Sequence, residues 1–317
     1  MEDEFTTAPE KNRLPRWLLI TLLCLAAGAV IAFFALRRNA ALENAAVTPE
    51  PAAVPTVDAN FQGLTVYFLD VGQGDCAFLR SPSGKTMLVD AGPEGSFGKI
   101  RRFLQQQNVE KLDMVVATHL HGDHIGSMEE IVDSFDVGSF YVTPFDSTES
   151  STYASLLAAL DAHGVTPVSV YAEGNTTLPW DDWAEVRVLA PYDVQYDTEN
   201  NTSLVLRVSY LHTAVLLAGD AEALSERLMV KAMKNHLLKA NVLKVGHHGS
   251  STGTTKKFLN AVKPQYAVIS VGKDNGYGLP DEKTVNRLIQ AGAQVYRTDE
   301  DGTVGFALDG THAWVLE

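Results

Sequence analysis

Residues 118–124 read Thr-His-Leu-His-Gly-Asp-His, and no other stretch constrains the fold of this chain as strongly. Three histidines and an aspartate fall within six positions, at His119, His121, Asp123 and His124. Imidazole nitrogens and carboxylate oxygens are ligands that zinc, iron and manganese accept, and one tight loop gathers them at a small cost in entropy. The alternative, a polar surface turn rich in histidine, does not require these residue types at this spacing. The stretch therefore predicts a metal site.

The residues just before this stretch predict how the chain presents it. Residues 112–117 read Leu-Asp-Met-Val-Val-Ala, a short and mostly apolar run that is typical of a buried β-strand. The candidate ligands would then follow the carboxyl end of that strand. Gly122 is expected to let the backbone turn tightly between the ligands, because glycine tolerates conformations that other residues avoid.

The pattern His119-x-His121-x-Asp123-His124 resembles the signature of the metallo-β-lactamase fold. In that family the first two histidines hold one metal ion and the Asp-His pair holds a second. A later aspartate bridges the two ions, and a further histidine completes the second site. The resemblance therefore implies two divalent ions, zinc or manganese, as cofactors.

Both of the further ligands that the resemblance implies have candidates downstream. Residues 211–220 form a mostly apolar run that ends in Gly-Asp, which makes Asp220 the candidate bridging ligand. Gly-Asp is also an ordinary turn that starts a helix, so the step alone does not decide the role. Another apolar run, at residues 241–246, leads to His247 and His248. The relatives suggest that His248 binds metal and His247 faces the substrate, but the reverse order stays open.

Two segments near the start of the domain narrow the resemblance. Residues 66–77 and 87–92 read Val-Tyr-Phe-Leu-Asp-Val-Gly-Gln-Gly-Asp-Cys-Ala and Met-Leu-Val-Asp-Ala-Gly, two strands with glycines where the chain must turn. Together with residues 201–206 and the His-His-Gly-Ser at 247–250, they resemble the metallo-β-lactamase-type domain of the ComEC competence-protein family. The phosphorylcholine esterases share much of this pattern. The resemblance covers residues 62–317.

The chain departs from the family pattern in two places. Many members of the fold carry another histidine between the two ligand blocks, and here only His163 and His212 lie there, at a helix end and a turn. The ligands of the first ion would then be His119, His121, Asp220 and water. In addition, residues 277–280 read Tyr-Gly-Leu-Pro where the ComEC-like relatives commonly read Tyr-Gly-His-Pro. With Leu279 in place of that histidine, the resemblance does not decide the exact substrate.

The first 61 residues predict an anchor rather than a catalytic part. Residues 17–36 form an uncharged apolar run, long enough to cross a bilayer as one helix. Three basic residues precede the run and two follow it, which favours a cytoplasmic tail at residues 1–16. Residues 37–61 are rich in alanine and proline and predict a semi-extended stalk. The domain at 62–317 is therefore expected to face outside the cytoplasm, tethered to the cell membrane by a single span.

Short β-rich runs alternate with helical stretches from residue 62 onward. Helices are expected over residues 97–107, 153–163, 221–238 and 281–291. This alternation is typical of an α/β (α+β) domain and suits the four-layer αββα sandwich of the resembled fold.

Charge bears on the choice of substrate. The chain has 39 acidic and 25 basic residues, and removing the seven acids and five bases of residues 1–61 leaves the domain with a net charge of −12. Such a domain has no general attraction for polyanions, because nonspecific DNA binding relies on contacts from Lys and Arg to phosphate. Five lysines lie near the second histidine motif, either along a phosphate-binding groove or solvated on a helix and its flanks: Lys244, Lys256, Lys257, Lys263 and Lys273.

The resemblance implies metal-assisted hydrolysis of a phosphodiester, with DNA as one candidate substrate. A water activated by the ions would attack phosphorus, Asp123 would orient that water, and His247 would stabilise charge or protonate the leaving oxygen. Four residues in or beside the motifs are candidate substrate contacts: Asn201, Ser203, Ser250 and Lys273. Two alternatives stay open, a cell-envelope esterase of the phosphorylcholine type and a non-catalytic accessory subunit of a DNA-uptake apparatus. With one apolar span the chain cannot form a channel, so a separate membrane protein would have to supply the pore.

Overall fold

The computed structural model describes residues 55–58, 60–145, 150–233 and 235–317. The chain divides into two units, Met1–Ala53 and Val54–Glu317, and all of the described residues belong to the second. The predicted cytoplasmic tail, membrane helix and most of the predicted stalk therefore lie outside the described residues. Within the described part, no helix is both long and apolar enough to cross a membrane.

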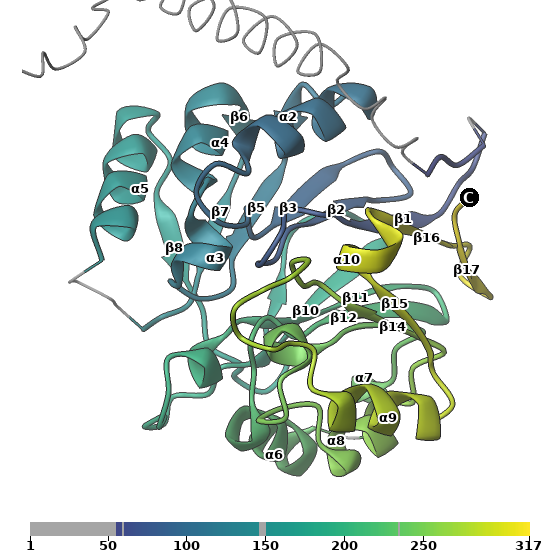
Figure 1. Cartoon of the computed structure of the whole chain (residues 1–317). Coiled ribbons are helices and arrows are strands. Elements are labelled where there is room, and N and C mark those ends of the chain that lie inside the picture. The colour runs from purple at the N-terminus through teal and green to yellow at the C-terminus, as the bar shows by residue number, and fades with distance from the viewer. Residues whose placement is uncertain (1–54, 59, 146–149, 234) are drawn as a thin grey trace, which may run out of the picture. The chain divides into compact units, whose positions relative to one another are not determined.

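Two mixed sheets form the centre of the domain (Figure 1). The first has the strand order β17-β16-β1-β2-β3-β5-β7-β8, and the second has the order β15-β14-β13-β12-β11-β10-β9. The strands of the first sheet are β1 (Leu64–Phe68), β2 (Ala77–Arg80), β3 (Thr86–Val89), β5 (Met114–Ala117), β7 (Phe140–Val142), β8 (Pro167–Ser169), β16 (Val304–Leu308) and β17 (Ala313–Val315). Those of the second are β9 (Thr177–Leu178), β10 (Ala184–Ala190), β11 (Val205–Tyr210), β12 (Thr213–Leu217), β13 (Val242–Lys244), β14 (Tyr266–Ile269) and β15 (Gln294–Arg297). A small separate pair joins β4 (Lys111–Leu112) to β6 (Asp136–Val137).

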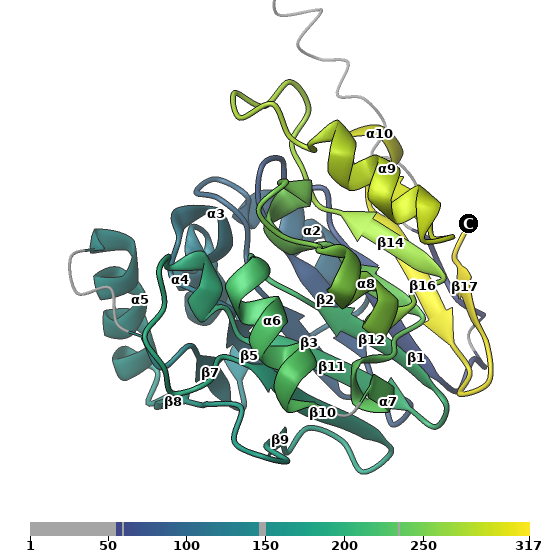
Figure 2. The ribbon, with the colours of Figure 1, turned by 90° about the horizontal axis from the view of Figure 1, so that it is seen from below.

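Helices cover the outer face of each sheet (Figures 1 and 2). The first sheet is covered by α2 (Phe97–Gln106), α4 (Met128–Ser134) and α5 (Ser151–Ala162), and the second by α6 (Ala223–Ala232), α8 (Lys256–Val262) and α9 (Glu282–Gln290). The shorter helices are α3 (Gly122–Ile125), α7 (Asn235–Leu238) and α10 (Thr298–Asp301), with 3-10 turns η1 (Asn200–Thr202) and η2 (Gly246–Gly249). The predicted αββα sandwich is therefore the arrangement of the described domain.

The apolar strands explain why both faces of each sheet must be covered. In β5, Met114 and Val116 face the core between the sheets, whereas Val115 and Ala117 face the helices. The same alternation in β12 points Val215 and Leu217 toward the other sheet. Side chains of successive strand residues point to opposite faces, so a continuous apolar strand is stable only where two layers cover it. Burial at about 25 cal/mol per Å² of apolar surface then stabilises all four layers together.

Two of the predicted segments are interrupted in the structure. The helix predicted over 221–238 ends where Met233 adopts an extended backbone and buries its side chain in the core under α6 and α8, and α7 follows separately. The strand predicted over 112–117 is divided between β4 and β5 at Asp113. The Asp113 carboxylate accepts hydrogen bonds from the backbone N–H and the hydroxyl of Thr86 instead.

Candidate metal centre

The candidate site lies where parallel strands of both sheets end. In the first sheet β3 pairs in parallel with β5, and in the second β12 pairs in parallel with β13. Asp90 follows β3, His119 follows β5, Asp220 follows β12, and His247 and His248 follow β13. Carboxyl ends of parallel strands meet at one edge of a sheet, where loops carry ligand-binding groups. The fold thus gathers residues that are up to 158 positions apart in the sequence.

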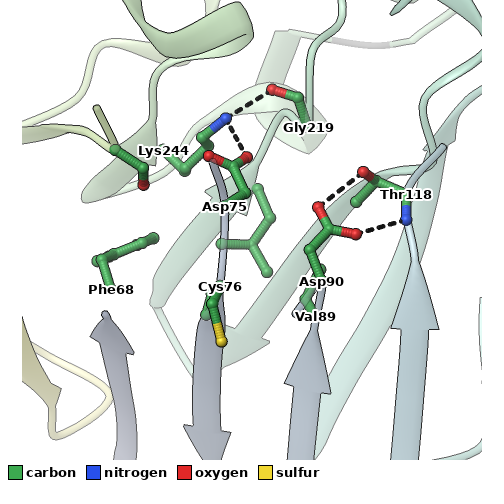
Figure 3. Close-up of a pocket in the computed structure, with 11 residues that line it drawn as sticks. Phe68, Asp75, Cys76, Val89, Asp90, Thr118, Gly219 and Lys244 are labelled. Atoms are coloured by element: carbon green, nitrogen blue, oxygen red, sulfur yellow. Dashed lines mark hydrogen bonds and ion pairs between the residues drawn. The ribbon is translucent and has the colours of Figure 1, made fainter. Parts of the chain in front are cut away.

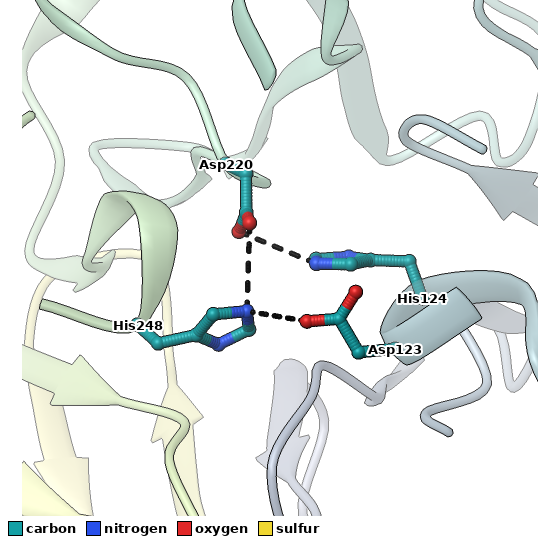
Figure 4. A group of neighbouring side chains, drawn as sticks. All are labelled: Asp123, His124, Asp220 and His248. Carbon is teal, nitrogen blue, oxygen red and sulfur yellow. Dashed lines mark hydrogen bonds and ion pairs between the residues drawn. The ribbon is translucent and has the colours of Figure 1, made fainter. Parts of the chain in front are cut away.

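Four side chains form the first ligand group, shown in Figure 4: Asp123, His124, Asp220 and His248. The Nε2 atom of His248 lies 3.1 Å from Asp123 Oδ2 and 3.4 Å from Asp220 Oδ2. The Nε2 atom of His124 lies 3.3 Å from Asp220 Oδ1. One ligand atom from each of the four falls within 4.8 Å of all the others, close enough for one ion to contact the whole group.

A second ligand group consists of His119, His121 and Asp220. His119 Nε2 lies 3.0 Å from His121 Nδ1 and 3.9 Å from Asp220 Oδ2. Asp220 belongs to both groups, with one oxygen near His124 and the other near His119 and His248. A carboxylate in this position can bind two ions at once, which is the geometry expected of a bridging ligand.

The histidines are oriented by hydrogen bonds to the ring nitrogens that face away from the centre. His124 Nδ1 lies 2.7 Å from Asp90 Oδ2, and His248 Nδ1 lies 2.9 Å from the carbonyl oxygen of Ser270. On the second group, Glu199 Oε2 lies 3.5 Å from His121 Nε2, an ion-pair contact and not a hydrogen bond. Acceptors at these positions favour a proton on the outward nitrogen and leave a lone pair on the inward one. The rings are therefore prepared to coordinate a metal ion.

Two buried atoms at the centre lie 3.3 Å apart without forming a hydrogen bond to each other or to another described residue. His124 Nε2 and Asp220 Oδ1 are buried and accept or donate no hydrogen bond among the described residues. Buried polar atoms are normally paired, because an unpaired one loses its hydration without compensation. An ion held between them would satisfy both atoms. The residues present thus fit a divalent metal, by donor type and by geometry.

The pKa values follow from this crowding of charges. Burial lowers the pKa of His124, but the carboxylates of Asp220, Asp90 and Asp75 outweigh it and raise that pKa to about 10. Burial also raises the pKa of Asp220, yet His248 and His124 hold it well below its usual range. A group of buried carboxylates that retains its charge in this way draws cations toward the centre, whether protons or metal ions.

Local backbone conformation places the last two histidines. His247 and His248 both adopt left-handed conformations, with φ of 48° and 51°. Such conformations cost energy in non-glycine residues and persist where the surroundings enforce them, often at functional sites. Just before Asp220, Gly219 has φ of 52°, and a Cβ atom there would come within 3.1 Å of Ser203 and Thr118 atoms. These turns fix the direction in which each ligand points.

The two adjacent histidines have different surroundings. His248 is 2% exposed and lies within the first ligand group, whereas His247 is 27% exposed and lines an open pocket of about 480 Å³. His247 Nδ1 lies 3.1 Å from Glu222 Oε1, and its Nε2 lies 4.0 Å from Asp220 Oδ2. Asp123, Asp220 and His248 line the same pocket. The geometry therefore favours metal contact for His248 and substrate contact for His247, the order that the sequence left open.

The candidate substrate contacts Asn201 and Ser203 are buried, so the structure does not support that role for them. Asn201 Oδ1 accepts hydrogen bonds from the backbone N–H groups of Glu222 and Ser225, which stabilises the start of α6. Ser203 Oγ accepts one from the N–H of Asp220 and donates to a backbone carbonyl. Both residues hold the ligand-bearing loops in place instead of meeting the substrate.

The other two candidate contacts do not line the pocket either. Ser250 is 9% exposed, and its hydroxyl is paired with that of Thr252. Lys273 is exposed, on the loop that borders the pocket, and its side chain is not among those that line it. The only polar residues that line the pocket besides the predicted ligands and His247 are Gln73, Asn200 and Tyr277, among the residues that the structure describes.

Lys244 has neither of the two roles that the sequence suggested for the lysines. It is 3% exposed, its ammonium group donates to the carbonyl oxygen of Gly219, and it forms a close ion pair with Asp75 (Figure 3). Asp220 Oδ1 lies 3.7 Å from the same nitrogen. Burial lowers the pKa of Lys244, but Asp75 and Asp220 outweigh it and raise that pKa. Lys244 is therefore a fixed positive charge behind the ligands, out of reach of a substrate.

Several residues that shape the centre were missed in the sequence. Asp75 and Asp90 lie in the segments that carry the family resemblance, and each is 5% exposed or less. An aspartate that directly follows an apolar strand, as Asp90 follows β3, is a detectable signal. Glu199 and Glu222 give no such signal, because only the fold brings them to His121 and His247.

Asp90→Asn is expected to weaken metal binding by about 10- to 100-fold, because the carboxylate that fixes the His124 ring loses its charge. Asparagine suits this position sterically, since Asp90 has φ of 60° and asparagine tolerates left-handed conformations. Competition with a chromogenic chelator measures the affinity. Asp113→Asn, which changes a carboxylate at the same sheet outside the centre, serves as the control. Equal affinity in Asp90→Asn and the wild type would contradict the orienting role.

Comparison with known proteins agrees with this geometry. The sequence model of the metallo-beta-lactamase superfamily matches residues 69–273. ComE operon protein 3 of Bacillus subtilis is 30% identical over 258 residues, which cover 76% of this chain and 32% of that protein. Competence protein ComA of Neisseria gonorrhoeae is 30% identical over 263 residues, covering 83% of this chain and 34% of its own length. The chain thus spans about a third of the length of these relatives.

Solved structures show the same fold at low sequence identity. CmlA, a diiron beta-hydroxylase from Streptomyces venezuelae, superimposes with a TM-score of 0.51 at 16% identity, over 79% of this chain and 55% of that one. YhfI from Bacillus subtilis, described as a metallo-beta-lactamase fold protein, gives a TM-score of 0.50 at 12% identity, over 80% and 99% of the two chains. Because one of the two is a hydroxylase by description, the fold alone does not fix the reaction.

Proposed function

Because the chain belongs to the metallo-beta-lactamase superfamily and is related to competence proteins, we propose that it is a metal-dependent phosphodiesterase that cleaves DNA at the outer side of the cell membrane. One observation carries the proposal: Asp220 is shared by two ligand groups that open into one pocket. Paired sites of this kind stabilise both the attacking and the leaving oxygen of a phosphoryl transfer. The pocket gives a phosphodiester access to both groups.

Each residue of the centre has a defined task in this proposal. His119, His121 and Asp220 would hold one ion, and Asp123, His124, Asp220 and His248 the other; zinc or manganese would supply Lewis acidity and activate water. Asp123 is about one third exposed, at 32%, so its carboxylate can orient a water beside the substrate. His247 faces the pocket with Glu222 behind it, in position to stabilise charge on the substrate or protonate a leaving oxygen.

The relatives support DNA as the substrate. One is described as Competence protein ComA, a second as ComE operon protein 3, and a third, from Haemophilus influenzae, as Recombination protein 2. The chain corresponds to about a third of each. The partner proposed for an uptake apparatus is a separate membrane protein that supplies the channel. The acidic domain is the main argument for the rival enzyme, a cell-envelope esterase that hydrolyses a small phosphodiester. A non-catalytic accessory subunit would retain the ligand set without turnover.

The deciding experiment compares two kinds of substrate on the purified full chain. Bis(p-nitrophenyl) phosphate and labelled single- and double-stranded DNA are incubated with manganese or zinc, beside Asp123→Ala and His121→Ala. DNA cleavage that needs metal and is lost in both variants would support the nuclease. Cleavage of the small diester alone would support the envelope esterase. Bound metal without turnover of either substrate would support the accessory subunit and sink the proposal.

The proposed anchor has its own test. Deleting residues 1–38, which contain the apolar run, is expected to move the protein from the membrane fraction to the soluble fraction, because no comparable span occurs among the described residues. Fractionation and immunoblotting measure the distribution. Protease added to intact cells should digest the full-length domain if it faces outward. Retention of the deleted form in membranes, or protection of the full-length domain, would contradict the anchored arrangement.

A further inference from the structure

One aromatic side chain at the rim of the pocket has no structural task. Tyr277 is 77% exposed, the largest exposed fraction among the big hydrophobic side chains of the described domain. It lines the same pocket as Asp123, Asp220 and His248. A ring that remains in water gains almost nothing from folding, since apolar stabilisation scales with the surface that is buried. Its position beside the ligand groups therefore calls for a partner that arrives with the substrate.

The loop that carries Tyr277 is fixed before any ligand binds. The side chain of Asn275 donates to the carbonyl oxygens of Gly272 and Leu279 and accepts from the N–H groups of Tyr277 and Leu279. At the start of the loop, the N–H of Gly272 donates to the side-chain oxygen of Gln73. At its end, the N–H of Asp281 donates to the carbonyl oxygen of Gly249. The ring is thus presented on an ordered loop, so that little backbone entropy is lost when a partner binds.

The pocket supplies little else for binding a nucleic acid. No lysine or arginine is among the described residues that line it. The domain as a whole carries an excess of acidic residues, which opposes binding to the phosphate backbone at a distance. Stacking of a base on an aromatic ring needs no positive charge and tolerates any base sequence. An aromatic platform is therefore the contact that suits this acidic surface.

We infer that Tyr277 is a stacking platform for an unpaired nucleobase next to the phosphodiester that is cleaved. This inference rests on the proposed nuclease function. A base can lie on the ring only when it is free of its complementary strand, so the enzyme prefers single-stranded DNA. A quaternary ammonium group, as in a phosphorylcholine ester, is instead recognised by a cage of several rings. Among the described residues, no second aromatic ring is paired with Tyr277, whereas one open face is what stacking requires.

The test uses substrates that differ only in their bases. The full chain with manganese is given an oligothymidylate and an oligonucleotide of the same length made of abasic tetrahydrofuran residues. For Tyr277→Ala, kcat/KM on the oligothymidylate is expected to fall about 5- to 150-fold, mainly through KM, while the abasic strand is cleaved at the wild-type rate. Tyr277→Phe keeps the ring and should retain activity. Trp183→Ala removes an exposed ring that lies outside the pocket and is the matched control.

A binding measurement gives a readout that does not depend on turnover. Fluorescence anisotropy with Asp123→Ala and Asp123→Ala/Tyr277→Ala should show weaker binding of the oligothymidylate in the double variant and no difference for the abasic strand. Equal losses on both strands, or no loss on either, would overturn the inference while leaving the nuclease proposal intact. If the wild type cleaves bis(p-nitrophenyl) phosphate and neither oligonucleotide, the nuclease proposal and the inference both fail.

Discussion

Asp220→Asn is expected to abolish turnover almost completely, with a fall of about 10³-fold or more, and to reduce the bound metal from two ions per chain to one or none. Changing a residue that only orients a ligand typically costs 10- to 100-fold. Changing Asp220 is expected to cause a larger loss because both ligand groups include it. His124 Nε2 lies 3.3 Å from one carboxylate oxygen, and His248 Nε2 lies 3.4 Å from the other. Elemental analysis of dialysed protein gives the stoichiometry, and hydrolysis of the best substrate gives the rate.

The control for this variant separates loss of function from loss of structure. Asp193→Asn removes a carboxylate from an exposed loop position and should leave both the metal content and the rate unchanged. Urea unfolding of the metal-free proteins should show that Asp220→Asn still folds, since asparagine has nearly the same shape and keeps the backbone N–H that donates to Ser203 Oγ. Two ions per chain and a wild-type rate in Asp220→Asn would rule out the bridging assignment.

The layers of the domain could be predicted because their signals are local. Apolar strands such as residues 114–117, helical stretches and the spacing of histidines can all be seen within short windows. The helix predicted over 221–238 was wrong in its length, because tertiary burial of Met233 interrupts it. The role expected of Gly122 was also wrong. It begins α3 with space around it, whereas Gly219, just before Asp220, has a left-handed backbone and contacts that leave little room for a side chain.

The surroundings of the ligands could not be predicted, because they come from distant parts of the chain. Asp90 orients His124 from 34 positions away, and Lys244 lies against Asp75 across 169 positions. No short window of sequence contains both members of either pair. For the same reason the motif predicts a substrate contact at Asn201, whereas the structure shows that its amide stabilises the start of α6. Sequence motifs identified residues near the centre and did not separate those that face the pocket from those that support it.

Lys244→Met is expected to lower the free energy of unfolding of the metal-free protein by about 3–5 kcal/mol, the usual cost of leaving one member of a buried ion pair without its partner. The ammonium group is held between Asp75 and the carbonyl oxygen of Gly219, and neither Lys244 nor Asp75 is more than 7% exposed. Methionine fills nearly the same volume, so the loss reports on charge rather than on a cavity. Urea unfolding measured in the presence of a chelator gives the difference.

A second substitution distinguishes charge balance from a general disturbance of packing. In Lys244→Met/Asp75→Asn the unpaired carboxylate is neutralised, so much of the lost stability should return even though two native residues are now absent. If the double variant is less stable than Lys244→Met alone, the lysine does not act through Asp75. Metal binding is a separate readout, and it is expected to be weaker than in the wild type in both variants, even where stability returns. Asp75 Oδ1 lies 3.4 Å from His248 Nδ1, and Lys244 Nζ lies 3.7 Å from Asp220 Oδ1, so the ion pair supports two ligands of the centre from behind. Recovery of stability without recovery of metal affinity would therefore assign the buried pair to positioning the ligands as well as to balancing their charge.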